Sequence, residues 1–104
     1  MLHKIISCFK DNKVLYSNHA KQEMEIEPLG EIREEEVSEA ILNGKVIEDY
    51  DDDEPYPSCL IYGRTRNNRP IHIVCAYADS IALSIVITVY EPSPEKWIDY
   101  ERRR

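Results

Sequence analysis

The longest apolar stretch of the chain runs from Pro70 to Pro92 and predicts the centre of a sheet. It contains two runs of β-branched and aromatic residues, Ile71–Tyr77 and Ile81–Tyr90, and both compositions favour strands. Ala78-Asp79-Ser80 lies between the two runs and can reverse the chain. Because no other stretch is as apolar for as long, we expect this hairpin to form the core.

The residues ahead of this hairpin predict three helices. Apolar side chains at positions 2, 5, 6 and 9 have helical spacing, which indicates a first helix over Leu2–Phe9. Ser17 is a suitable N-cap for a second helix that continues to Met24. The acids Glu34–Glu36 favour the positive end of a third helix dipole, and Asn43-Gly44 ends that helix.

Two further strands and a last helix complete the predicted elements. Lys45–Tyr50 alternates between apolar and polar residues and indicates an edge strand, and Ser58–Arg66 indicates a second strand. Asn67-Asn68 favours a tight turn into the central hairpin. Ser93-Pro94-Glu95 is typical of a helix start, with serine as the cap and proline at the first helical position.

This order predicts the α+β class in one domain over residues 1–104. Helices come first and hairpin-linked strands follow, so the N-terminal helices should pack on one face of a four-stranded antiparallel sheet. A short C-terminal helix carrying Trp97 should follow the sheet. We expect the tail, residues 99–104, to be flexible.

The charge of the chain limits the classes of partner. There are 20 acidic and 13 basic residues, a net charge of −7, which argues against a protein that coats nucleic acid through general basicity. A small local basic site remains compatible with this balance. The acidic run Asp49–Glu54 lacks the ligand spacing and the glycine of a calcium loop, so we expect a solvated loop and no metal site.

The cysteines and the lengths of the apolar runs point to a cellular setting. Cys8, Cys59 and Cys75 are odd in number, widely spaced and without a C-x-x-C motif, which argues against both disulfides and zinc. Buried free thiols in a reduced cytoplasm are the expectation. The sequence has no signal-peptide pattern and no apolar run of membrane-spanning length, so we expect no membrane contact.

Several motifs together resemble a known family. The chain resembles an uncharacterised prokaryotic domain family with a Ser-x-His-Ala helix and a Thr-x-Tyr-x-Pro strand end, over residues 17–97. The motifs that carry the resemblance are Ser17-Asn18-His19-Ala20, Asn43–Tyr50, Pro55–Gly63, Arg69–Val74, and Ile87–Pro92 with Trp97. That family is similar to the RelE/ParE-like toxins. The resemblance implies a RelE-like fold, metal-independent RNA cleavage without a cofactor, and two partners, RNA and a small antitoxin-like protein.

RNA cleavage without a metal needs a base for the 2′-hydroxyl, an acid for the leaving oxygen and a cation for the phosphate. His19 and His72 are candidates for acid and base, because histidine titrates near neutral pH. Glu23 lies four residues after His19, on the same helix face, where it could orient His19 or serve as a base. Tyr90 is a further catalytic candidate.

The predicted phosphate ligands come from the strands. Arg69 and Arg64 could each hold a phosphate through two parallel hydrogen bonds, and Thr88 could donate a third. Thr88 and Tyr90 are two residues apart in a strand and therefore share a face. Whether that face is also the face of His72 depends on the length of the hairpin loop, which the sequence leaves open.

Each candidate also has a structural interpretation. His19 could pack or cap its helix, His72 could be a hydrogen-bonded core residue, and Tyr90 could close the end of its strand. A second function follows from these interpretations, namely a non-catalytic protein-binding module with a degenerate site. Such a module would hold its partner through the acidic loop and the sheet edge. The sequence leaves open whether the chain forms a homodimer.

Overall fold

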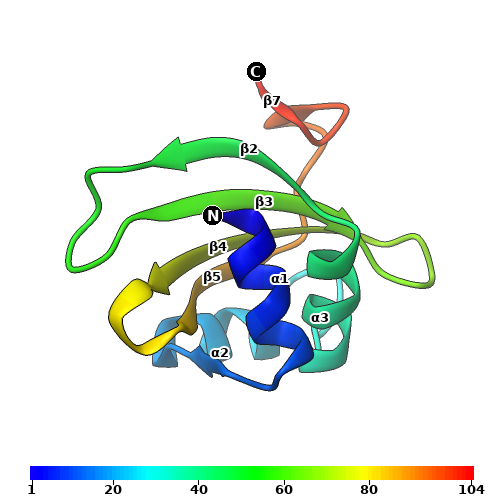
Figure 1. The fold of residues 1–104 in the computed structure, drawn as a ribbon. Coiled ribbons are helices and arrows are strands. Elements are labelled where there is room, and N and C mark those ends of the chain that lie inside the picture. The colour runs from blue at the N-terminus through cyan, green and yellow to red at the C-terminus, as the bar shows by residue number, and fades with distance from the viewer.

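Three helices cover one face of a five-stranded sheet in the computed structural model, which describes all 104 residues (Figure 1). The chain alternates between short helices and strands before it enters the long hairpins. The elements are α1 (Leu2–Lys10), β1 (Val14–Tyr16), α2 (Asn18–Ile26), α3 (Glu34–Leu42), β2 (Lys45–Tyr50), β3 (Ser58–Arg64), β4 (Pro70–Ala78), the 3₁₀ turn η1 (Asp79–Ile81), β5 (Leu83–Tyr90), β6 (Trp97–Ile98) and β7 (Arg102–Arg103).

The sheet has the order β1-β5-β4-β3-β2, and its last four strands are antiparallel. The expected α+β class is confirmed, and the four antiparallel strands are present. The expectation that they form the whole sheet is wrong, because β1 adds a parallel fifth strand on β5. Val14–Tyr16 is too short to show a periodicity of its own. It becomes a strand because α1 carries the chain back to the open edge of β5, where Ser84 N–H and Val86 C=O bond to the residues that flank β1.

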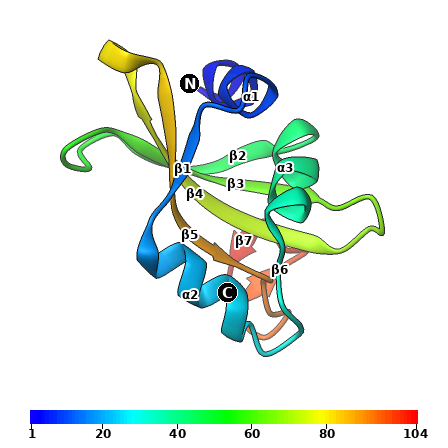
Figure 2. The same cartoon turned by 90° about the horizontal axis from the view of Figure 1, so that it is seen from below.

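The main core lies between the sheet and the three helices, which stand in front of the strands in Figure 2. Ser17 caps α2 by accepting a hydrogen bond from Ala20 N–H at 3.0 Å, and α3 begins at Glu34, so both predicted helix starts are confirmed. A Cβ on Gly63 would lie 1.9 Å from the carbonyl oxygen of Ala40, so α3 can approach β3 only because residue 63 is glycine. The core joins both layers through Ile5, Ala20, Val37, Ala40 and Ile41 from the helices and Ile61, Ile71, Ile73, Cys75 and Val89 from the sheet.

The structure bears on two further expectations, that the cysteines are buried free thiols and that no segment is long enough to cross a membrane. All three cysteines are free and buried, which confirms the interpretation of Cys8, Cys59 and Cys75 as thiols inside the protein. None of the helices has the length and apolar character that a membrane crossing requires.

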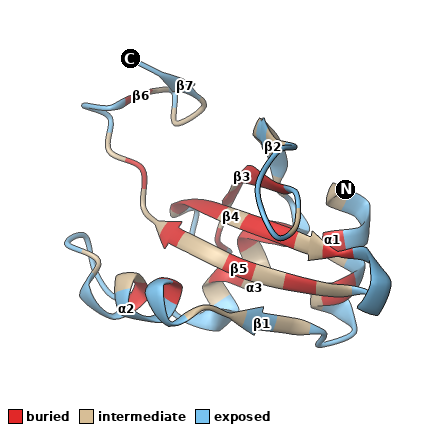
Figure 3. Cartoon of the chain, turned by 90° about the vertical axis from the view of Figure 1, so that its left-hand side faces the viewer, coloured by how far each residue is buried: buried red, intermediate tan, exposed pale blue.

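The C-terminal helix expected at Ser93 is not formed. The chain makes one turn there, closed by Lys96 N–H and Trp97 N–H on the carbonyl of Ser93. It then folds into the β6–β7 hairpin, because Asp99 and Tyr100 adopt left-handed φ values of 54° and 63°, which a right-handed helix cannot contain. We call residues 93–104 the C-terminal strap. The strap lies on the side of the sheet away from the helices, and Figures 1 and 3 show this from two directions.

Candidate functional site

The face of the sheet that the helices do not cover carries His72 at its centre. Side chains alternate along β4, so Ile71 and Ile73 enter the helix-covered core and His72 points to the other side. His72 is paired with Tyr62 of β3 and with Tyr90 of β5. We call this surface the helix-free face.

His72 is enclosed and both of its ring nitrogens have partners. The side chain has no solvent exposure. Nε2 lies 2.6 Å from the carbonyl oxygen of Tyr100, and Nδ1 lies 3.1 Å from Tyr90 Oη. A carbonyl can only accept, so Nε2 carries the proton and donates it, and Nδ1 accepts from the Tyr90 hydroxyl. The Trp97 ring meets the imidazole edge-on at 4.5 Å between centroids.

Burial sets the protonation states of His72 and Tyr90. It lowers the pKa of His72 below the ordinary histidine value of 6.5, against the opposing hydrogen bond to Tyr100 and the charge of Glu48. Burial also raises the pKa of Tyr90 to about 12. At neutral pH the imidazole is therefore an uncharged base and the phenol an uncharged donor.

A cavity of about 370 Å³ opens beside Tyr90 and contains two cations, Lys96 and Arg103. Arg103 donates to Glu48 twice, from Nε to Oε2 at 2.7 Å and from Nη2 to Oε1 at 3.1 Å. Its guanidinium also lies 4.7 Å from the centre of the Trp97 ring. Lys96 is exposed and lines the same cavity. The complete lining is Tyr90, Glu91, Ser93, Lys96, Trp97 and Arg103.

Arg64 and Thr88 belong to the same face. Arg64 ends β3, two residues after Tyr62, and its Nε donates to Tyr62 Oη at 3.0 Å. Its guanidinium carbon lies 5.4 Å from the centre of the Tyr100 ring. Thr88 is paired with Val74, two positions from the Tyr90–His72 pair, and is half-buried. The structure therefore brings Arg64, Thr88, His72 and Tyr90 onto one surface.

His19 and Glu23 lie on α2, on the other side of the sheet. His19 Nε2 is 3.4 Å from Glu23 Oε2, and the imidazole is 66 % exposed. Glu23 Oε1 also accepts from Val89 N–H at 3.0 Å, and Glu27 accepts from Glu91 N–H at 3.0 Å. These carboxylates satisfy the edge of β5 beyond the end of β1. The structure therefore does not bring His19 or Glu23 to His72.

Arg69 is enclosed by protein acceptors rather than open to a ligand. Its guanidinium contacts Glu91 at 2.6 Å and Glu36 at 3.3 Å, and the side chain is 18 % exposed. It also donates to the carbonyls of Gly30 at 2.5 Å and Glu31 at 3.0 Å. Arg69 joins the loop after α2, helix α3 and the end of β5, and its charge is already matched by two carboxylates.

Lys96 and Arg103 were not among the predicted site residues, and Glu48 was also missed. The expected C-terminal helix and flexible tail placed Lys96 and Arg103 away from the sheet. The apolar and aromatic residues Trp97, Ile98 and Tyr100, which stand among charged residues, could have indicated a packed segment. Its position over His72 depends on the two left-handed residues, which no local pattern predicts.

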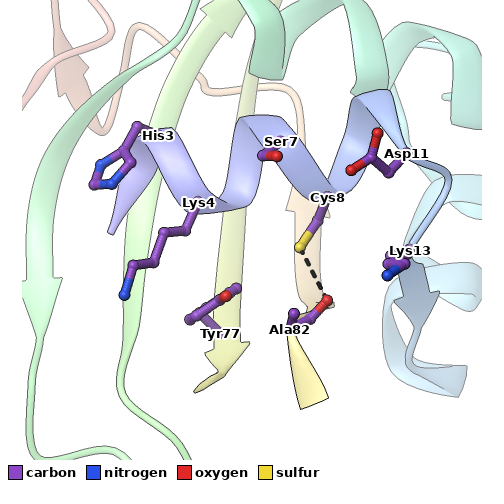
Figure 4. A pocket seen from close by; sticks show the side chains of 8 residues that line it. All are labelled: His3, Lys4, Ser7, Cys8, Asp11, Lys13, Tyr77 and Ala82. Carbon is purple, nitrogen blue, oxygen red and sulfur yellow. Dashed lines mark hydrogen bonds between the residues drawn. The ribbon is translucent and has the colours of Figure 1, made fainter. Parts of the chain in front are cut away.

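A second cavity, of about 210 Å³, lies between α1 and the β4–β5 hairpin (Figure 4). Two of its lining side chains have polar partners. Lys4 Nζ lies 3.3 Å from Asp79, and the Cys8 thiol donates to the carbonyl of Ala82 at 3.4 Å, as the dashed line shows. The lining mixes both charges in His3, Lys4, Ser7, Cys8, Asp11, Lys13, Tyr77 and Ala82. No group of three or more His, Cys, Asp or Glu is arranged to hold a metal ion anywhere in the chain.

Comparison with known proteins gave one family. Residues 16–91 match the family described as Domain of unknown function (DUF4258). The matched range runs from the end of β1 to the residue after β5 and so includes His72, Tyr90, Arg64 and Thr88. It ends before the C-terminal strap. No curated protein and no solved structure matched the chain.

Proposed function

The chain belongs to this family of unknown function, and we propose that it is a RelE-like RNA endonuclease that acts on the helix-free face. The observation that carries the proposal is the 3.1 Å hydrogen bond between His72 and Tyr90 beside a cavity with two cations. It combines a neutral base, a neutral donor and positive charge, which are the three requirements of RNA cleavage without a metal.

The proposed reaction is attack of the RNA 2′-oxygen on the adjacent phosphorus. His72 accepts the 2′-hydroxyl proton on Nε2, in the tautomer that carries its own proton on Nδ1. The bond between phosphorus and the 5′-oxygen breaks, and Tyr90 gives its hydroxyl proton to that oxygen. The products are a 2′,3′-cyclic phosphate and a 5′-hydroxyl. The Nδ1 proton of His72 then passes to the Tyr90 oxygen along their hydrogen bond, which restores the phenol and leaves the proton from the 2′-hydroxyl on Nε2. Exchange with water removes that proton and returns one to Nδ1, which restores the starting tautomer.

The cations of the helix-free face supply the charge stabilisation. Arg103 can exchange its carboxylate partner for a phosphate, and Lys96 adds a second charge. Arg64 and Thr88 lie on the same face, where they could donate hydrogen bonds to a neighbouring phosphate of the RNA. Arg69 has no part in this scheme, because Glu36 and Glu91 already neutralise it.

The likeness to RelE/ParE-like toxins supplies the biological setting of the proposal. A toxin of this kind acts on cytoplasmic RNA, arrests growth when produced alone and is held inactive by a small antitoxin-like protein. The chain's net charge of −7 means that binding would depend on the local cations rather than on the whole surface.

The test is cleavage of single-stranded RNA by the purified protein in the presence of a chelator. We expect cyclic phosphate ends to accumulate. His72→Gln and Tyr90→Phe should each lower the cleavage rate by about 100-fold or more, which is the range that general acid–base groups contribute. His19→Gln is the matched control, because that exposed histidine lies on the opposite side of the sheet and should leave the rate unchanged. RNA that survives all four proteins would contradict the proposal.

A second candidate function is a non-catalytic module that binds a basic segment of a protein partner. The observation that favours it is that β2 is an edge strand followed by the exposed acids Asp51–Glu54. An edge strand offers free backbone groups to an extended peptide, and the acids match a positive charge. Titration with a lysine-rich extended peptide tests it, since Asp51→Asn with Asp52→Asn should weaken binding and His72→Gln should not.

A further inference from the structure

We propose that the C-terminal strap is an autoinhibitory cover of the helix-free face, and that RNA reaches His72 only when the strap lifts. The inference rests on the proposed function for what the strap regulates. It concerns residues 93–104, which lie outside the range that matches the family. Four features of the strap carry it, namely what it covers, which tautomer it selects, how it is held and where it can bend.

The strap covers His72, the only base of the proposed reaction. His72 has no exposed surface, and two strap residues lie against it. The Tyr100 carbonyl occupies Nε2 at 2.6 Å, and the Trp97 ring lies edge-on against the imidazole at 4.5 Å. A 2′-hydroxyl must come within hydrogen-bond distance of that same nitrogen, and it cannot do so while Tyr100 is in place.

The strap also selects the unreactive tautomer. Because the Tyr100 carbonyl accepts the Nε2 proton, the lone pair of His72 is turned towards Tyr90. The proposed reaction needs the reverse arrangement, with the lone pair on Nε2 and the proton on Nδ1. Removal of the carbonyl frees Nε2, and the Tyr90 oxygen can then accept the Nδ1 proton. Lifting the strap therefore uncovers the base and permits its reactive form.

The strap is held by side chains and not by the sheet. Strands β6 and β7 pair only with each other. The charged contacts to the sheet are Arg103 with Glu48 at 2.7 Å and Glu101 with Lys45 at 2.6 Å, both on β2. Partly exposed ion pairs of this kind contribute little each, so the strap can lift without the loss of any ladder hydrogen bond.

The backbone favours release at two places. Asp99 and Tyr100 hold φ values of 54° and 63°, which are uncommon for residues other than glycine, so the turn between β6 and β7 is one place where the strap can change its backbone conformation. Pro92 is buried at the end of the sheet, and the chain leaves the core from Ser93 onwards. RNA can also drive the release, because its phosphates compete with Glu48 for Arg103. Arg103 and Lys96 then stay on the bound phosphates, while Trp97 and the Tyr100 carbonyl move off His72.

Trp97 provides a direct measurement, because it is the only tryptophan and it is 4 % exposed under the closed strap. Glu48→Gln removes the carboxylate that holds Arg103. We expect acrylamide to quench Trp97 fluorescence at least about twofold more strongly in this variant, and RNA cleavage to rise about fivefold, the change that loss of one such ion pair permits. Glu101→Gln, which removes the second contact, should act in the same direction.

Glu39→Gln is the matched control. Glu39 is as exposed as Glu48, at 26 %, and pairs with Arg66 on the helix side of the molecule. Both readouts should stay at their wild-type values. Unchanged Trp97 quenching in Glu48→Gln and Glu101→Gln overturns the proposal, and so does stronger quenching with slower cleavage. If no variant cleaves RNA, the proposed function fails, and the quenching alone still decides whether the strap is a releasable cover.

Discussion

The two faces of the sheet are closed by different means. On the helix side, apolar side chains from three helices fill the space, and Gly63 lets the backbone of α3 approach β3. On the helix-free side, a short strap closes the surface with hydrogen bonds, ion pairs and aromatic edges around His72. The first closure depends on shape and the second on charge and protonation. Changes of volume should therefore damage the first face, and changes of pH or salt should act on the second.

The largest effect should come from Gly63→Ala. The added methyl group would lie 1.9 Å from the Ala40 carbonyl, so α3 or β3 must move and the packing of the helix layer is lost. We expect a loss of about 3 kcal/mol or more in the free energy of unfolding, measured with urea. Tyr62→Phe, which removes one hydroxyl from the other face, should cost about 1 kcal/mol. Equal losses in the two variants would remove the contrast between the faces.

A smaller loss is expected from Arg69→Met. It leaves Glu36 and Glu91 close together and without their shared cation, in a site where the arginine side chain is only 18 % exposed. We expect about 2 kcal/mol of destabilisation, less than for a fully buried pair. The double variant Arg69→Met with Glu91→Gln should recover part of it. A double variant less stable than Arg69→Met would mean that the carboxylates contribute through other contacts.

The next effect in size should be a change of folding stability with pH, which His72 on the helix-free face should cause. The pKa of His72 is lowered in the folded protein, so as pH falls through 6.5 the unfolded chain takes up the proton first. Folding stability should therefore decrease on acidification, relative to a His72→Gln variant without this group. Urea unfolding of both proteins from pH 8 to pH 5 measures the difference. Parallel curves would show that His72 titrates alike in both states.

The smallest effect should come from Lys45→Met. This change removes the ion pair to Glu101, whose partners are 57 % and 36 % exposed, so less than about 1 kcal/mol of stability should be lost. Hydrogen exchange at the amides of the strap should nevertheless become faster. Exchange that accelerates equally in α3 would show that the strap and the helix layer open together.

The comparison also shows which parts of the molecule the sequence could predict. The central hairpin and the Ser17 cap follow from local patterns, and the structure confirms both of them. The membership of β1 in the sheet, the place of Arg69 and the course of the strap depend on segments far apart in the chain. Arg69 illustrates the difficulty, because its four acceptors come from Gly30, Glu31, Glu36 and Glu91.

Glu23 of α2 and Glu27, the residue that follows the helix, have a consequence for self-association. Glu23 and Glu27 take the free N–H groups of β5 beyond β1, so that side of the sheet offers only the three residues of β1 to another strand. The six residues of β2 form the only long open edge. Growth of a fibril by strand addition needs two such edges on every copy. Pairing of β2 with β2 would therefore stop at two molecules. The carboxylates of Glu23 and Glu27 would prevent further growth, because they occupy the backbone N–H groups that another strand would need.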